Sequence, residues 1–183
     1  MANEMLFMQL TLKGKAVPGD SKISGYEGQI ELKSMSWGLA VENKTADKGA
    51  TKVAKNLKAE ELRLSKFFDS ATTVLMGHMD EREGLRSSAP SAISKSKTDN
   101  VAVITMVGVS AVKSGEKMPV LMKVTVKGAR LKSVSSRAAE SGAFLSLSED
   151  IKLAFKELKI DYFPAAEGNA RGGATTFDYV PKE

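Results

Sequence analysis

Apolar and polar residues alternate over most of this 183-residue chain, and this pattern restricts the fold more than any other feature. A period of two is typical of β-strands that bury one face. The alternating segments predict strands at about 5–13, 27–41, 60–68, 101–112, 118–134, 149–163 and 174–180. About seven to eight strands with little helix indicate a mainly β fold, a closed barrel or a sandwich. We expect one domain covering residues 1–183.

The alternation changes phase inside three of the long predicted strands. In GQIELKSMSWGL (28–39) the apolar positions change from even to odd near Ser34. Similar changes occur around Gly128 and between Phe155 and Leu158. A slip of one residue moves every later side chain to the opposite face unless a bulge or bend intervenes. These strands are therefore expected to cross a barrel corner, or to have their second face buried by another subunit.

Helical spacing is convincing once, in DSATTVLMGHM (69–79). Asp69 or Ser70 can cap the first turn of this helix. Its apolar face is predicted to contain Ala71, Val74, Leu75 and Met79. We expect one short helix that plugs or flanks the barrel.

No group of residues in the sequence is suited to catalysis or metal binding. The chain has no cysteine and a single histidine, His78, and no nucleotide-binding glycine motif is present. Glu149 and Asp150 are adjacent, so on a strand they point to opposite faces and cannot share a proton-transfer site. The simpler interpretation is that one carboxylate is solvated and the other is paired. We expect no enzymatic activity, no catalytic residue, no cofactor and no metal.

Two polar segments lack the alternation expected of core strands. Residues 42–58 contain five lysines, Lys44, Lys48, Lys52, Lys55 and Lys58, and residues 80–99 are rich in serine. The lysines favour a solvated face or a subunit-contact loop, with a phosphate-binding patch as the alternative. A net charge of +5 leaves nucleic acid open as a partner, but 22 acidic residues interleave with the 27 basic ones and aromatic residues make up only 6%.

Trp37, the single tryptophan, lies among alternating apolar residues. This position favours a core or interface residue over a platform for stacking a ligand. The beginning of the chain, MANEMLFMQLTLKGK, lacks a basic-then-apolar leader, and no apolar run reaches the length of a membrane span. The sequence therefore predicts a protein made in the cytoplasm without stable membrane insertion.

The string GDSKISGYEGQIELKSMSWGL (19–39) resembles the opening of the Hcp family, the haemolysin-coregulated tube proteins of bacterial type VI secretion systems. Further segments resemble the family in the same order, at 62–75, 124–136 and 148–164. The resemblance implies a small β-barrel with one flanking α-helix, similar to phage tail-tube proteins. It also implies a homo-hexameric ring, stacked into a tube that a contractile sheath expels behind a VgrG-type spike and whose lumen carries effector proteins.

The resemblance also gives roles to the polar segments. It makes 42–58 an extended inter-ring loop, with Lys44, Lys48, Lys52 and Lys55 in ring stacking, and 80–99 a variable loop. Trp37 is expected to be a buried core or interface anchor. The protein would be cytoplasmic before firing and then secreted without a cleaved signal peptide. Two alternatives stay open: a phage tail-tube-like protein and, less favoured, a basic β-barrel module that binds nucleic acid.

Overall fold

The computed structural model describes residues 4–44, 54–82, 100–109, 118–141, 144–164 and 173–180. Within these ranges the chain forms twelve strands and one helix, which confirms the mainly β prediction with one short helix. Their bounds are β1 (Glu4–Leu12), β2 (Lys15–Val17), β3 (Ile30–Ser36), β4 (Leu39–Lys44), β5 (Ala54–Ala59), β6 (Leu62–Phe67), α1 (Ser70–Arg82), β7 (Val101–Gly108), β8 (Val120–Lys127), β9 (Arg130–Ser141), β10 (Phe144–Ala154), β11 (Glu157–Tyr162) and β12 (Thr175–Tyr179).

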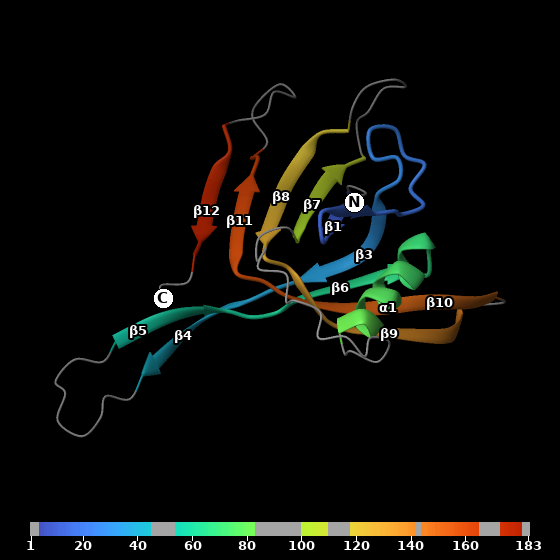
Figure 1. The fold of residues 1–183 in the computed structure, drawn as a ribbon. Coiled ribbons are helices and arrows are strands. Elements are labelled where there is room, and N and C mark those ends of the chain that lie inside the picture. Colours follow the sequence, from blue (N-terminus) through green and yellow to red (C-terminus); the bar gives the residue numbers. More distant parts are fainter. Residues whose placement is uncertain are drawn as a thin grey trace.

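Ten of the strands form one antiparallel sheet in the order β12-β11-β8-β7-β1-β3-β6-β10-β9, with β2 paired to β1. Figure 1 shows this sheet curving strongly, so that β12, β11, β8 and β7 stand side by side while β3, β6 and β10 run across them. The helix α1 lies against the β6, β9 and β10 part of the curve (Figure 1). Among the described residues, β12 and β9 are the two edges and do not pair with each other.

The strand number exceeds the prediction because each of the three long predicted strands divides in two, and because β2 and β5 were not predicted. The phase changes within these long strands have structural causes. Near Ser34 the cause is a bulge: Leu32 pairs with Lys66 and Ser34 with Ser65, so that Lys33 is an extra residue. Near Gly128, whose φ is +62°, β8 ends and β9 begins. Phe155 and Lys156 separate β10 from β11. All three slips are thus bends or bulges of a curved sheet, as the barrel-corner interpretation predicts.

The core lies on the concave side of the sheet, where apolar side chains from most strands meet. Fully buried members include Met8, Ile30, Leu62, Ile104 and Leu153. The helix covers this core with Ala71 and Leu75, which are both inaccessible to solvent.

The predicted helix face was wrong at one position. Val74 is 41% exposed, whereas Thr72 is fully buried. A threonine is buried there because its hydroxyl has polar partners inside the molecule, which periodicity alone does not reveal.

Candidate functional site

A β-hairpin projects from the sheet as a direct continuation of two of its strands. The ladder between β3 and β6 continues through a hydrogen bond from the Glu60 N–H to the Gly38 carbonyl, at 2.8 Å, into the β4–β5 pair. In Figure 1 this hairpin extends away from all other described elements. Residues 42–58 were predicted as an extended loop; at its two ends the structure shows strands instead, since β4 continues to Lys44 and β5 begins at Ala54, while residues 45–53 lie outside the described residues.

The hairpin contains two of the four lysines predicted to act in stacking. Lys44 is the last residue of β4 and Lys55 is the second residue of β5. Lys48 and Lys52 lie outside the described residues, as does most of the serine-rich 80–99 segment.

One face of the hairpin is apolar and uncovered. Val41 lies directly opposite Leu57, and Leu39 opposite Ala59. The exposed fractions are 59% for Val41, 44% for Leu57 and 38% for Leu39. A two-stranded hairpin is at best marginally stable in water, so a face of this kind is stabilised by a partner. The signal was present in the sequence as alternating Leu39 and Val41, which the strand prediction counted as part of a core strand.

Two aromatic residues, Tyr179 and Trp37, lie near the base of the hairpin. The Tyr179 hydroxyl accepts from the Ala59 N–H at 3.2 Å and lies 3.3 Å from the Leu57 carbonyl. Trp37 lies between β3 and β4, half-buried and packed against the core. Tyr179 therefore connects β12 to the base of the hairpin, whereas Trp37 packs against the core where β3 passes into β4.

A buried charged network lies at the end of β6 that is farther from the hairpin. Lys66 on β6 and Glu149 on β10 are directly opposite each other in the register and both side chains are 0% exposed. The Lys66 ammonium is 2.7 Å from Glu149 and 2.5 Å from Asp69, and it donates to the Thr72 hydroxyl at 3.0 Å. Thr72 and Ser136 donate to the two Glu149 oxygens at 2.8 and 3.1 Å.

This network confirms the interpretation of the adjacent carboxylates. Glu149 is buried and paired, whereas the Asp150 side chain is 61% exposed on the opposite face. Every buried polar side-chain atom of the described residues has a partner. The network therefore fixes the start of α1 to β6 and β10, and it has no free group for chemistry.

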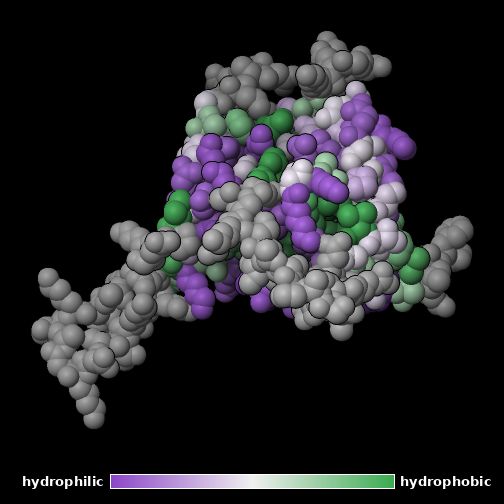
Figure 2. Space-filling model, in the orientation of Figure 1, coloured by the Kyte–Doolittle hydropathy of each residue, from purple (hydrophilic) through white to green (hydrophobic). Residues whose placement is uncertain are grey.

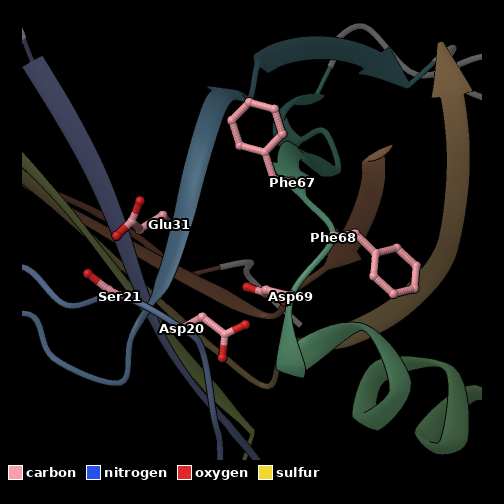
Figure 3. Close-up of a pocket in the computed structure, with 6 residues that line it drawn as sticks. All are labelled: Asp20, Ser21, Glu31, Phe67, Phe68 and Asp69. Carbon is pink, nitrogen blue, oxygen red and sulfur yellow. The ribbon is translucent and has the colours of Figure 1, made fainter. Parts of the chain in front are cut away.

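A pocket opens on the solvent side of this network, at the end of β6 (Figure 3). It is lined by Asp20, Ser21, Glu31, Phe67, Phe68 and Asp69. In Figure 3 the two phenylalanines point to different sides of the chain, while Asp20 and Asp69 lie together at the start of α1. Phe67 is 55% and Phe68 45% exposed.

The pocket carboxylates differ in what holds them. Asp20 accepts hydrogen bonds from the Ser70 N–H at 3.1 Å and the Ser70 hydroxyl at 2.5 Å, and these bonds hold the pKa of Asp20 below its usual value. Asp69 accepts from the Ala71 N–H at 2.9 Å, which makes Asp69 the cap of the two candidates, Asp69 and Ser70, that the sequence offered. Glu31 has no hydrogen-bond or ion-pair partner among the described residues.

The remaining described surface gives no sign of catalytic chemistry. The described residues contain no group of three or more histidine, cysteine, aspartate or glutamate side chains arranged to hold a metal. None of the described helical residues forms a helix long and apolar enough to cross a membrane. Figure 2 shows hydrophilic residues over most of the described surface of one face, with separate hydrophobic areas between them.

Comparison with known proteins gives a consistent result. Residues 7–162 match the family model described as type VI secretion system effector, Hcp. The fold is similar to that of Hcp1 from Salmonella typhimurium, with a TM-score of 0.66, 19% identity, and coverage of 98% of this chain and 95% of that one.

Two further solved structures share this fold. A type six secretion system protein gives a TM-score of 0.68 at 18% identity, covering 94% of this chain and 92% of its own. The Hcp1 protein of E. coli EAEC 042, in a double-mutant form, gives 0.64 at 12% identity, covering 96% and 99%. No match was found among curated proteins.

Proposed function

This chain belongs to the Hcp family of type VI secretion proteins, and from that membership we propose that it is a structural subunit of the secretion tube. In this proposal six copies form a ring, the rings stack into the inner tube, and the lumen carries effector proteins. The subunit performs no catalysis. It is assembled in the cytoplasm and then leaves the cell with the expelled tube.

The observation that carries the proposal is the family match over residues 7–162, which includes the β4–β5 hairpin, the pocket at the end of β6 and the strands of the curved sheet up to β11. Two structural features support assembly in particular. The sheet has two unpaired edges in its described part, β12 and β9, and natural proteins usually cover or pair such edges. The apolar hairpin face also lacks a cover within the described chain.

The hairpin supports stacking because it projects from only one end of the β3–β6 pair. A projection at one end and a different surface at the other produce head-to-tail contacts, which close into rings or continue as stacks. The proposed partners are further copies of this chain, the sheath, a VgrG-type spike and effector proteins. Lys44, Lys48, Lys52 and Lys55 keep their proposed role in stacking.

The test is the oligomeric state of the purified full chain. Native mass spectrometry should give six copies, and negative-stain images should show six-membered rings with an open pore. A monomer at every protein concentration would overturn the proposal. Detection of the protein in culture supernatant only when the sheath is intact would test secretion, and equal release without the sheath would contradict it.

A further inference from the structure

The β4–β5 hairpin is attached to the rest of the subunit only at its base. Strands β4 and β5 continue into β3 and β6, and the hydrogen bond between Glu60 and Gly38 lies at this junction. Among the described elements, β4 and β5 make extensive contact only with each other. The direction in which the hairpin leaves the sheet therefore depends on few contacts.

One of these contacts comes from β12, which is distant in the sequence. The Tyr179 hydroxyl accepts from the Ala59 N–H and donates to the Leu57 carbonyl, so that it uses both its donor and its acceptor capacity on β5. Alternate residues of an antiparallel strand direct their N–H and C=O groups to the same edge. Since Ala59 lies opposite Leu39 on β4, this edge is the one that β4 does not occupy. The hydroxyl thus takes the place of a neighbouring strand beside β5.

Tyr179 is well placed to act as a fixed support. It is 8% exposed and lies opposite Leu158 of β11, which is buried in the core, whereas the other four residues of β12 are exposed. In Figure 1 the end of β12 points towards the base of the hairpin. The family match ends at residue 162, so Tyr179 belongs to a part of the chain that the match does not include.

A small change of angle at the base of the hairpin is amplified along its length. Residues 54–59 span about 17 Å at about 3.3 Å per residue, so a tilt of about 10° moves the far end by about 3 Å. A displacement of this size separates atoms that were in hydrogen-bond or packing contact. A support at the base therefore controls where the far end of the hairpin lies.

From this geometry we infer that Tyr179 is a positioning residue, whose hydroxyl fixes the direction of the β4–β5 hairpin and makes β12 and the hairpin move as one unit. The inference rests on the proposed function, in which the hairpin acts in stacking, and adds to it the group that holds the hairpin in place. Tyr179→Phe removes the hydroxyl and preserves the packing of the ring. This variant therefore changes the support of the hairpin without opening the core.

A distance between two spin labels tests the direction of the hairpin, and the chain contains no cysteine that would compete for the labels. One label is placed by Lys44→Cys at the far end of β4, and the other by Lys123→Cys at an exposed position of β8. Strand β8 stands across the direction of the hairpin in Figure 1, so a tilt of the hairpin changes the distance. Labelled subunits are diluted with unlabelled ones, so that each ring contains at most one labelled subunit. Tyr179→Phe should broaden the distance distribution by about 3 Å or more.

Stacking is the second measurement, with two matched controls. Tyr179→Phe should form six-membered rings that give shorter stacks in negative-stain images. Tyr162→Phe makes the same chemical change at a tyrosine that is 53% exposed on β11, and Ile151→Val removes a buried methyl group from the core of β10. Both controls should leave the distances and the stacks unchanged. Incorporation of 4-aminophenylalanine at position 179, whose amino group can donate and accept, should restore both.

The outcomes separate this inference from the proposed function. An unchanged distance distribution in Tyr179→Phe would overturn the inference and leave the tube function standing. A broadened distribution with normal stacks would also overturn it, because the direction of the hairpin would then have no effect on stacking. Loss of rings in Tyr179→Phe, or equal effects of Ile151→Val, would assign Tyr179 a general role in the fold and overturn it as well. Absence of rings in the unmodified protein would instead refute the proposed function.

Discussion

Substitution of Lys66 by methionine should destabilise the fold more than almost any other single change in the chain. The side chain is fully buried between two carboxylates, Asp69 and Glu149. Methionine preserves most of the length of the aliphatic stem but removes the ammonium. The variant therefore leaves two carboxylates close together without the cation that stabilises them.

The expected loss follows from the burial of the pair. Removing one partner of a buried ion pair costs about 3–5 kcal/mol, because the other charge stays in the interior. For a domain of this size, 1 kcal/mol corresponds to about 2–4 °C in Tm, so that Lys66→Met should lower Tm by about 6–20 °C. Glu149→Gln should cost less, about 1–3 kcal/mol, because Lys66 keeps its contact with Asp69 at 2.5 Å.

The assay is thermal and urea unfolding at one fixed protein concentration, followed by circular dichroism. The double variant K66M/E149Q should be more stable than K66M alone, because it contains one carboxylate fewer in the network. The matched control is Lys127→Met, whose ion pair with Glu157 at 3.2 Å is 57% and 40% exposed. Its effect should stay below about 1 kcal/mol.

Two results would refute this reasoning. If the free energy of unfolding of Lys66→Met lies within about 1 kcal/mol of that of the unmodified protein, the network does not hold a charge in the interior. If K66M/E149Q is less stable than K66M, the Glu149 charge does not destabilise the protein that lacks Lys66, contrary to the expected coupling between the two side chains.

Three further changes have definite expected outcomes. Thr72→Val should lower the free energy of unfolding in urea by about 1–3 kcal/mol, because the buried hydroxyl bridges Lys66 and Glu149. Thr73→Val, at an exposed position, should change it by no more than about 0.5 kcal/mol. Equal effects of the two substitutions would contradict this. Gly128→Ala should lower Tm, because the φ of Gly128 is +62° and an added Cβ would lie 2.9 Å from the Lys156 side chain. An unchanged Tm would show that the backbone at this bend relaxes without cost. Asp20→Asn should be less stable than the unmodified protein at pH 7. The Ser70 hydrogen bonds lower the Asp20 pKa from 3.8, so the stabilisation by the Asp20 carboxylate exists above pH 3.8 and disappears as pH falls through the lowered pKa. Curves of stability against pH for Asp20→Asn and the unmodified protein that stay parallel down to pH 2 would contradict the assignment.

Much of the fold was predictable because the alternation is a local property. The period of two identified most core strands, and the slips near Ser34, Gly128 and Phe155 marked the places where the sheet bends. The short strand β2, the strand β5 and the extensions of β9 and β10 were missed. Strand β5 lies in a lysine-rich segment with little alternation, and the extension of β9 and β10 passes through a run of serines and alanines. Such strands are specified by their pairing partner, which no local pattern contains.

The candidate site was only partly predictable. The lysines of 42–58 drew attention to the hairpin, but its apolar face was counted as part of the core, because exposure is not visible in a strand pattern. A helix cap at Asp69 or Ser70 was predicted from residue type, and the structure gives that role to Asp69. The pocket was not predicted, since its lining residues come from the 18–29 connection, β3 and the β6–α1 junction.

The sequence by itself determined the mainly β class, the short capped helix, the positions of the bends and the family. These properties depend on residues that are close together in the chain, where backbone geometry and side-chain period apply directly. Only the tertiary structure decided that Lys66 faces Glu149, that Thr72 is buried while Val74 is exposed, and which apolar residues remain uncovered. These depend on how distant strands pair, and that pairing is set by packing the whole chain into one curved sheet.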